Sequence, residues 1–344
     1  RDASGCQTSK GISVSENAPL NISVNSKTNA NCQGQANGSV SLNANGGAGF
    51  YEYGYSDANY QNNSTISNLV SGSYVFWVKD AIGCKISIAD QIGLNSSLNA
   101  TIATKQNLLC FNDHTGSVTL SNTGSNSGPI TYSKDGLVFQ NTPVFGNLAA
   151  GNYTFTLKDN LCTVTVSDNI SEPSLLSLAG NIDNQVSCFG GSNAKITVTQ
   201  NGGTSSYTFS SDDTNYTNSN VFDNLPIGNY KYWVKDQNGC KASTSIFTIT
   251  QPTDIIFSVS SKTDISCFGG NDGVVTLDAN GGITSYEYTI DNANYQSSNI
   301  FSGLNYGLKT FGIKDQNGCT KTTSTTLLQP TALQLSISQS KNLV

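Results

Sequence analysis

Several residue types are scarce in this chain of 344 residues. It has no methionine, a single histidine, His114, and only 12% charged residues, about half of the usual ~25%. The net charge of −6 leaves no basic surface to neutralise phosphates or anionic headgroups, so we expect neither nucleic-acid binding nor polybasic membrane docking. One imidazole also cannot form a histidine-based metal cluster.

Long hydrophobic runs are absent as well. Runs of aliphatic and aromatic residues such as Val75–Val78 are far below the ~18 residues of a membrane span, so no membrane insertion is expected. The chain starts at Arg1 without a signal peptide, and we interpret it as an internal piece of a longer precursor. Its 36% hydrophobic residues and 33 glycines are typical of a globular protein that builds cores.

Cysteines, by contrast, are plentiful and evenly spaced. Nine of them lie at alternating intervals of 26 and 52 residues, with one interval of 27, so cysteines of the same phase recur every 78 or 79 residues. The first series is Cys32, Cys110, Cys188 and Cys267, and the second is Cys6, Cys84, Cys162, Cys240 and Cys319. A repeat of this length exceeds a solenoid unit, which predicts a small domain with its own core in each copy.

The cysteine period divides the chain into segments. We expect residues 1–19 to be the C-terminal part of a preceding repeat and residues 333–344 to be the start of a following repeat. The four complete copies, called repeats 1 to 4 from here on, are 20–97, 98–175, 176–253 and 254–332. The joints are short, and several seams contain proline, at Pro19, Pro173 and Pro252, so we expect a rod-like array.

Two disulfide pairings fit this periodicity. One spans 52 residues, and the other spans 26. We favour the 52-residue span because it encloses the body of a repeat, whereas the 26-residue span encloses the joint. The expected bonds are Cys32 with Cys84, Cys110 with Cys162, Cys188 with Cys240 and Cys267 with Cys319, and Cys6 stays unpaired in this chain. Regular disulfides imply an oxidising, extracytoplasmic compartment, and the lack of C-x-x-C spacing argues against zinc.

The residues between the cysteines predict strands. Apolar positions alternate with polar ones, as at Val40 and Leu42, and this period of two, bounded by glycine and asparagine, is typical of half-buried strands. Six or seven short strands per repeat predict an all-β fold, a tandem array of small immunoglobulin-like β-sandwich domains with one disulfide each. The motif Leu-x-x-Gly-x-Tyr, as at 69–74, resembles the tyrosine corner of such sandwiches. The recurring rings of Tyr60, Phe139, Tyr216 and Tyr295 are interpreted as core residues.

The motifs of the repeat also resemble a known family. Repeat 4 reads Cys-Phe-Gly-Gly-Asn-Asp-Gly at 267–273, Asn-Gly-Gly at 280–282, Tyr-x-Tyr at 286–288 and Lys-Asp-x-x-Gly-Cys at 314–319. Together they resemble the SprB-type repeat of very large secreted surface proteins of Bacteroidetes, which include adhesins of gliding bacteria. The resemblance covers nearly the whole chain and implies type IX secretion to the cell surface or the medium. Repeat 2 departs most, because its turn Asp159-Asn-Leu-Cys162 lacks the turn glycine.

One aspartate in each repeat is a candidate ligand. Asp80, Asp159, Asp236 and Asp315 each follow a lysine and lie just before a second-series cysteine. Calcium takes six to eight oxygen ligands, to which such carboxylates could contribute. An aspartate in a turn more often accepts hydrogen bonds from backbone N–H groups two residues on. We therefore favour the turn role and expect no cofactor, with calcium as the alternative.

Two tryptophans are candidate binding residues. Trp77 and Trp233 are out of phase with the core residues of their strands, so their rings could stack on sugar rings. The alternative is that they pack against a neighbouring domain or under a loop. Thr156 and Gly312 occupy the equivalent places in repeats 2 and 4, so this site is not common to all repeats.

These observations predict a structural or adhesive function. We expect no enzyme, because neither a Ser-His-Asp set nor paired carboxylates recur with the repeat. The expected function is the extracellular shaft of a large bacterial surface adhesin, serving gliding motility in the family it resembles, with weak contacts along its length that multiply avidity. The expected partners are other repeats of the same chain and a surface polysaccharide or abiotic surface. Carbohydrate-binding modules and spacers of a secreted type IX enzyme remain alternatives.

Overall fold

The computed structural model describes residues 1–336, and every regular element in that part of the chain is a β-strand. The expected start of a following repeat at 333–344 lies mostly outside the described residues. Within 1–336 no helix is long and apolar enough to cross a bilayer. The chain divides into two compact units, Arg1–Glu172 and Pro173–Val344, and each is described by itself.

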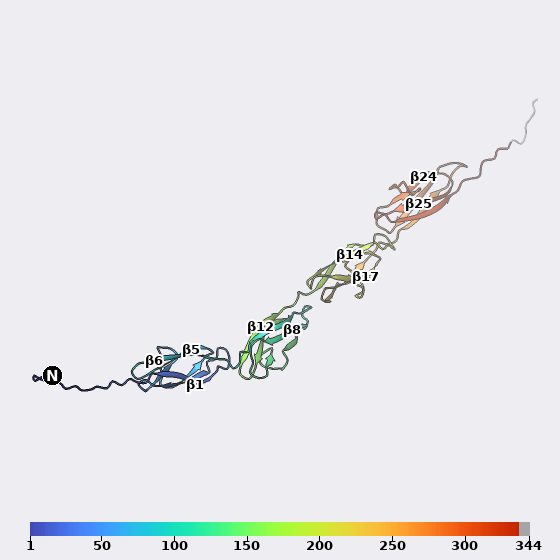
Figure 1. Ribbon diagram of the computed structural model, residues 1–344. Coiled ribbons are helices and arrows are strands. Elements are labelled where there is room, and N and C mark those ends of the chain that lie inside the picture. Colours follow the sequence, from blue (N-terminus) through green and yellow to red (C-terminus); the bar gives the residue numbers. More distant parts are fainter. Residues whose placement is uncertain (337–344) are drawn as a thin grey trace, which may run out of the picture. The chain divides into compact units, whose positions relative to one another are not determined.

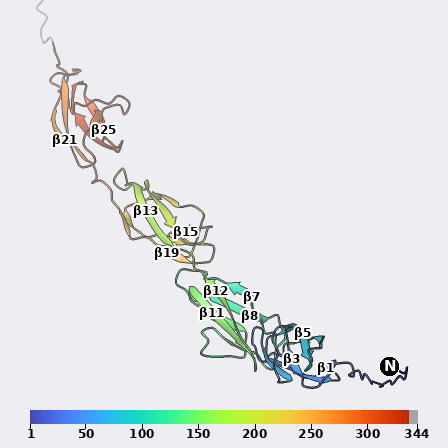
Figure 2. The same ribbon diagram turned by 90° about the vertical axis from the view of Figure 1, so that its left-hand side faces the viewer.

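Repeats 1, 2 and 4 each fold as two small antiparallel sheets around one core, and repeat 3 folds as three (Figures 1 and 2). In repeat 1 one sheet has the order β1-β2-β4 and the other the order β3-β5-β6. Their bounds are β1 Asn21–Thr28, β2 Gly38–Asn45, β3 Glu52–Gly54, β4 Thr65–Leu69, β5 Gly72–Lys79 and β6 Lys85–Ile92. The expected all-β, immunoglobulin-like sandwich is confirmed.

Repeats 2 and 4 have the same strand order, and in repeat 3 the second sheet is divided into β15-β18-β19 and β17-β20. Repeat 2 contains β7 Ala100–Gln106, β8 Gly116–Asn122, β9 Thr131–Ser133, β10 Val144–Leu148, β11 Gly151–Lys158 and β12 Thr163–Ile170. Repeat 3 contains β13 Ser177–Asn184, β14 Ala194–Asn201, β15 Thr208–Ser210, β16 Val221–Leu225, β17 Gly228–Tyr230, β18 Trp233–Lys235, β19 Lys241–Ser243 and β20 Phe247–Ile249. Repeat 4 contains β21 Ile256–Thr263, β22 Gly273–Asn280, β23 Glu287–Thr289, β24 Ile300–Leu304, β25 Gly307–Lys314 and β26 Thr320–Leu327. Repeat 3 has more strands because its two long strands are each interrupted.

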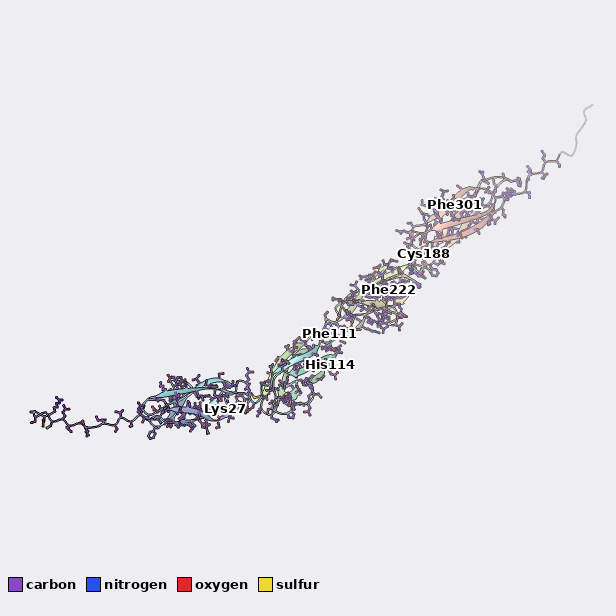
Figure 3. The ribbon with its side chains drawn as sticks, in the orientation of Figure 1. Lys27, Phe111, His114, Cys188, Phe222 and Phe301 are labelled. Atoms are coloured by element: carbon purple, nitrogen blue, oxygen red, sulfur yellow. A yellow bond between two sulfur atoms is a disulfide. The ribbon has the colours of Figure 1, made fainter. Side chains whose placement is uncertain are left out.

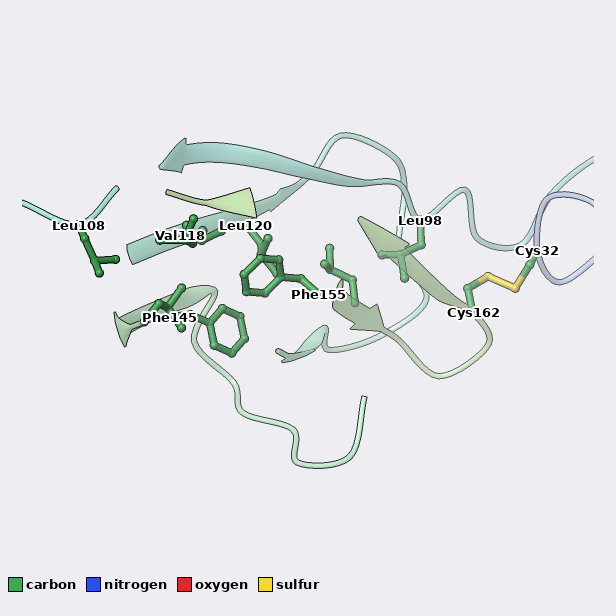
Figure 4. Close-up of a cluster of buried hydrophobic side chains, with 11 residues drawn as sticks. Cys32, Leu98, Leu108, Val118, Leu120, Phe145, Phe155 and Cys162 are labelled. Carbon is green, nitrogen blue, oxygen red and sulfur yellow. A yellow bond between two sulfur atoms is a disulfide. The ribbon is translucent and has the colours of Figure 1, made fainter. Parts of the chain in front are cut away.

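Each repeat has a separate hydrophobic core. The strand that follows each first-series cysteine alternates buried and half-buried residues, as the period of two predicts. In repeat 2 Val118 and Leu120 of β8 face Phe155 of β11, with Phe145 beside them (Figure 4). The rings of Phe145 and Phe155 lie 5.3 Å apart between centroids, a distance at which aromatic pairs attract.

A bulge recurs in the first strand of every repeat. The pairing of β1 with β2 shifts register between Val24 and Ser26, and the first strands of repeats 2 and 4 shift at the equivalent places, whereas β13 of repeat 3 shifts two residues later, between Ile182 and Asn184. A bulge turns the following side chains relative to the sheet. In repeat 1 Lys27, labelled in Figure 3, then lies 2.8 Å from Asp90 of β6, which ties one sheet to the other. Lys105 and Asp168 make the same contact in repeat 2 at 2.9 Å.

The tyrosine of the Leu-x-x-Gly-x-Tyr motif forms the corner that its sequence resembles. The hydroxyls of Tyr74, Tyr153 and Tyr230 each donate a hydrogen bond to the backbone carbonyl four residues earlier, at 3.0, 3.1 and 2.9 Å. Repeat 4 has Lys309 at this position, and its ammonium group donates to the side chain of Asn305 instead. The corner therefore closes in every repeat, by a different donor in the last one.

Repeat 3 carries a buried hydroxyl in its core. Tyr232 is 1% exposed and occupies the place of Phe76, Phe155 and Phe311 in the other repeats. Its hydroxyl has no hydrogen-bond partner within the described residues. Burial raises the pKa of Tyr232 to about 12, with a further contribution from Tyr230, so the group stays protonated and unbonded.

We predict opposite effects for two tyrosine-to-phenylalanine substitutions. Tyr232→Phe removes an unpaired buried hydroxyl and should stabilise repeat 3 by about 1 kcal/mol. Tyr153→Phe removes a formed hydrogen bond and should destabilise repeat 2 by a similar amount, about 1 kcal/mol. Hydrogen exchange of the peptides over β11 and β18, read by mass spectrometry, measures each repeat separately. A loss of hydrogen-exchange protection in repeat 3 on Tyr232→Phe would contradict the conclusion that the hydroxyl of Tyr232 is buried without a partner.

Candidate functional site: the junctions between repeats

The disulfides join one repeat to the next. Cys32 of repeat 1 is bonded to Cys162 of repeat 2, 130 residues later, with the two Cα atoms 5.6 Å apart. Cys188 of repeat 3 is bonded to Cys319 of repeat 4, 131 residues later, also with 5.6 Å between Cα atoms. Figure 4 shows the first bond beside Leu98 at the edge of the core of repeat 2.

The expected pairing within each repeat is therefore wrong. Cys32 is not bonded to Cys84, Cys162 not to Cys110, Cys188 not to Cys240 and Cys319 not to Cys267. Cys110 and Cys240 are also disulfide-bonded, whereas Cys6, Cys84 and Cys267 are free thiols. The 26-residue alternative is wrong as well. Neither spacing considered from the sequence is the one that forms.

The reason is that the two cysteines of a repeat lie at opposite ends of its sandwich. Cys32 follows β1, next to the exit of the repeat, where Ala30 N donates to Gly93 O at 3.0 Å. Cys84 lies at the entry of the repeat. Asp80 of its turn accepts the N–H of Ala48, and the neighbouring Gly47 N donates to Ala18 O at 2.7 Å, just before the repeat begins. A strand of eight residues separates the two ends by roughly 25 Å. A disulfide needs Cα atoms within about 7 Å, so it forms only with the adjoining repeat.

The backbone at the junction of repeats 1 and 2 is tied on both sides. Ala30 and Leu94 form a parallel bridge between the cysteine loop and the joint. Asn95 N donates to Ala30 O at 2.9 Å and Ser96 N donates to Asn31 O at 3.0 Å. Cys162 Sγ lies 3.8 Å from Ser96 O. The joint residues thus contact the cysteine loop of repeat 1 and the cysteine turn of repeat 2 together.

Asp159 organises the repeat 2 side of this junction. Its Oδ1 accepts the N–H groups of Leu161 and Cys162 at 2.9 and 2.6 Å, and its Oδ2 accepts Ser127 N at 2.8 Å. The hydroxyl of Ser96, which is fully buried, donates to the same Oδ2 at 2.7 Å. Burial raises the pKa of Asp159, but these donors outweigh it and hold the pKa below its ordinary value.

The equivalent aspartates have the same role in the other repeats. Oδ1 of each accepts two N–H groups of its own cysteine turn, and Oδ2 accepts one N–H from the turn that follows the second strand of the repeat. The N–H donors to Asp80 are Ile82, Cys84 and Ala48. Those to Asp236 are Asn238, Cys240 and Thr204. Those to Asp315 are Asn317, Cys319 and Ile283. All four side chains are buried.

This geometry fits anchored turns better than cation ligands. The carboxylate oxygens point at N–H hydrogens. These hydrogens carry partial positive charge, so they take the place of a cation beside the carboxylate. Within residues 1–336 no group of three or more His, Cys, Asp or Glu side chains could hold a metal ion. His114 is exposed in the loop before β8 (Figure 3).

The junction of repeats 3 and 4 repeats this arrangement with different side chains. Ser187 O accepts a hydrogen bond from Asn317 Nδ2 at 2.9 Å and lies 3.4 Å from Cys319 Sγ. Gly190 N donates to the side chain of Gln251 at 2.9 Å. An open hollow of about 380 Å³ beside the disulfide is lined by Phe189, Pro252 and Asp315 among others. The joint is again held by both repeats.

The tryptophans lie on the outer face of their sheets. Trp77 of β5 pairs with Gly54 and Ser87 on its two neighbours, and Trp233 of β18 pairs with Ser210 and Ser243. The small neighbours leave part of each ring uncovered, and both residues are half-buried. Lys231 Nζ lies 5.5 Å from the ring of Trp233, a cation–π distance.

The recurring rings expected in the core are instead partners of lysine. Lys79 Nζ lies 4.8 Å from the ring centroid of Tyr60, and Lys235 Nζ lies 4.3 Å from that of Tyr216. Lys314 with Tyr295 and Lys158 with Phe139 make the same contact at 4.4 and 6.0 Å. The lysine of each Lys-Asp pair therefore covers an aromatic ring outside the core, while the aspartate anchors the turn.

The fold and the junctions define a class of protein, a tandem array of immunoglobulin-like domains with cross-links from one repeat to the next. The SprB repeat model matches residues 24–59, 102–136, 181–214 and 259–294, once in each of the four repeats. These four matches across the chain are consistent with an array of SprB-type repeats.

The chain is also similar to solved structures of tandem domains. The chain is similar to the eight N-terminal Ig domains of Down Syndrome Cell Adhesion Molecule, with 12% identity and a TM-score of 0.31, over 91% of this chain and 48% of that one. It thus spans about half the length of that structure. It is also similar to a tetra-tandem repeat in the extending region of a large adhesion protein, with 13% identity, a TM-score of 0.28, and 90% and 99% of the two chains covered. These similarities concern the fold alone. No curated protein matches the chain.

We predict that acid weakens the aspartate-anchored turns. The pKa of Asp80 and that of Asp159 are lowered by the folded structure, so their stabilising contribution is present above the unfolded pKa of about 3.9 and is lost as pH falls through the folded value. Hydrogen exchange of β11 and β12, measured from pH 7 down to about pH 2.5, should show declining protection below about pH 4.

A substitution separates this effect from general acid unfolding. Asp159→Asn places an amide N–H₂ against N–H donors and should destabilise repeat 2 by about 1–3 kcal/mol at neutral pH. It should also reduce the pH dependence of hydrogen-exchange protection in repeat 2. Asp278→Asn, at an exposed position, is the matched control and should change neither. Equal protection in Asp159→Asn and the wild type at pH 7 would refute the role given to this carboxylate.

Proposed function

We propose that this chain is part of the extracellular shaft of a large surface adhesin, which holds a binding region away from the cell and carries tension. The SprB repeats support an adhesin-like repeat region, and disulfides of regular spacing are typical of oxidising compartments outside the cytoplasm. The observation that carries the proposal is the bond from one repeat to the next. Work against an external surface, as in gliding motility, is the setting that such a shaft suits.

The inter-repeat bond changes the path of an applied force. When the ends of repeats 3 and 4 are pulled apart, the load passes through the disulfide, and the chain between Cys188 and Cys319 lies outside the load path. Only the roughly 12 residues on either side of that loop extend, which is on the order of 90 Å of chain. Two folded sandwiches already span roughly 60–80 Å. Unfolding of a repeat therefore adds very little length.

A disulfide within a repeat would protect less. It would exclude only the 52 residues between the two cysteines of that repeat, and the joint between repeats would stay a single unbraced segment. With the bond placed across the joint, the joint is closed by two covalent connections, the backbone and the disulfide. This is the property that a long tension-bearing array requires, and no binding pocket is needed for it.

We predict that the length released by unfolding depends on the disulfides. Pulled by its ends in a single-molecule experiment, the oxidised chain should show only small length gains when repeats 3 and 4 unfold. After reduction each repeat should release about 25 nm, from 78 residues of ~3.5 Å. A full-length gain from oxidised repeats 3 and 4 would refute the load path.

Two variants provide the controls for this experiment. Cys188→Ser with Cys319→Ser should restore one full gain of about 25 nm, because the remaining cysteine of repeat 4, Cys267, is free. Cys84→Ser should leave the trace of the oxidised chain unchanged, because Cys84 is also free. A full-length gain in Cys84→Ser would show that the disulfide across the junction is not the cause of the small length gains.

A second candidate function rests on the tryptophans. The partly uncovered rings of Trp77 and Trp233, next to small cross-strand neighbours, have the geometry of a stacking platform for sugar rings. On beads that carry the chain, retention on a glycan array should then fall at least tenfold on Trp77→Ala with Trp233→Ala. Retention that is unchanged in this variant would leave the shaft as the function of the repeats.

A further inference from the structure

Two free cysteines occupy positions that are bonded elsewhere in the same structure. Cys84 of repeat 1 lies directly before β6, as Cys162 and Cys319 lie directly before β12 and β26. Cys267 of repeat 4 follows β21, as Cys32 and Cys188 follow β1 and β13. The bonded Cys32 and Cys162 are 8% and 3% exposed, whereas Cys84 and Cys267 are exposed. The same positions are thus covered where a neighbouring repeat is present.

The turn around Cys84 already has the conformation of the bonded turns. Asp80 accepts the N–H of Cys84 at 2.8 Å, and Asp315 accepts that of Cys319 at 2.9 Å. Asp80 N donates to Cys84 O at 3.0 Å, and the equivalent bond in repeat 4 has the same length. The thiol of Cys84 therefore needs no rearrangement of its own turn to reach a partner.

The end of repeat 1 that carries Cys84 also exposes apolar side chains. Ile82 is 68% exposed and Phe50 is 91% exposed, and both line an open groove beside the cysteine turn. Two residues after the aspartate of the turn, where repeat 1 has Ile82, repeat 2 has Leu161, which is half-buried and packs against the core cluster that includes Cys32. Repeat 4 has Asn317 at this position, and its side chain donates a hydrogen bond to Ser187 of repeat 3. In both described junctions this position contacts the preceding repeat.

Residues 1–19 show which partner belongs at this end. Asp2 Oδ1 accepts the N–H groups of Ser4 and Cys6 at 3.0 Å each, and Asp2 N donates to Cys6 O at 3.1 Å. This is the aspartate-anchored cysteine turn of the repeats. Ile12 and Val14 then alternate as the apolar residues of β6 do, but they are 84% and 88% exposed. The segment has the turn and the strand pattern that close a repeat, without the sheet that such a strand completes.

We propose that Cys84 and Cys267 form disulfides with further SprB-type repeats, Cys84 with the first-series cysteine of a preceding copy and Cys267 with the second-series cysteine of a following copy. The partner at both ends is another copy of the same repeat. Repeat 1 is then bonded both to repeat 2 and to the copy before it, and repeat 4 is bonded both to repeat 3 and to the copy after it. Neither repeat 1 nor repeat 4 contains a disulfide of its own.

The bond forms by thiol–disulfide exchange. The thiolate of Cys84 attacks a disulfide oxidant, such as a thiol–disulfide oxidoreductase or oxidised glutathione, and releases one thiol of the oxidant. The thiolate of the second cysteine then attacks the mixed disulfide and releases the other. Two cysteine thiols are oxidised, one oxidant disulfide is reduced, and the two protons end on the oxidant thiols.

A tandem chain tests the proposal directly. In a protein in which residues 20–332 are followed by a second copy of 20–332, Cys267 of the first copy and Cys84 of the second are about 130 residues apart, the separation of Cys32 and Cys162. The oxidised protein is alkylated without reduction, digested and mapped by mass spectrometry. We expect a peptide that links these two cysteines and only two alkylated thiols, Cys84 of the first copy and Cys267 of the second.

The matched control is Cys84→Ser in the second copy alone. Cys267 of the first copy should then become alkylated, while the bond between Cys32 and Cys162 in each copy stays and reports correct folding. Four alkylated thiols in the unsubstituted tandem chain, or a bond between Cys267 and any other cysteine, would overturn the proposal. The same mapping of a secreted protein that carries this chain should find Cys84 and Cys267 unalkylated, and alkylation of either would equally overturn it.

Discussion

The buried aspartate of each cysteine turn fixes the geometry on which the junctions depend. Its carboxylate accepts N–H groups from two segments, the turn that presents the cysteine and the turn that ends the second strand. A buried carboxylate without such donors would be costly, so the two segments are held together at one end of the sandwich. At the first junction Asp159 also accepts a hydrogen bond from the hydroxyl of Ser96, so the same carboxylate also holds the joint in place.

The disulfides follow from this placement. With the second-series cysteine held at the entry of one repeat and the first-series cysteine at the exit of the repeat before it, the two sulfurs meet across the joint. Each bond closes a loop of about 130 residues, which in the chain-entropy model is worth about 5 kcal/mol. That stabilisation is shared by two domains, so the folding of neighbours is linked as well as their connection under load.

The lysine and the aspartate of the Lys-Asp pair have different roles, which shows how a small domain uses few charges. The aspartate turns inward and organises backbone donors, whereas the lysine turns outward over an aromatic ring, as Lys235 does over Tyr216. Such a contact buries the apolar stem of the lysine and part of the ring. With so little charge available, the repeat places each charged group where it bonds to a specific partner.

The sequence by itself determined the repeat, its all-β class, the alternation of Val40 and Leu42 into a core, and the tyrosine corner, because these depend on residues close in the chain. It did not determine the disulfide partners. Spacing measures separation along the chain, and both cysteines of a repeat flank the same body of sequence. Only the tertiary structure decided the pairing, because the eight-residue strands place Cys32 and Cys84 at opposite ends of the sandwich. The rings of Tyr60 and Tyr216 were misassigned to the core for a related reason, since a recurring aromatic residue satisfies a surface lysine contact as well as a core position.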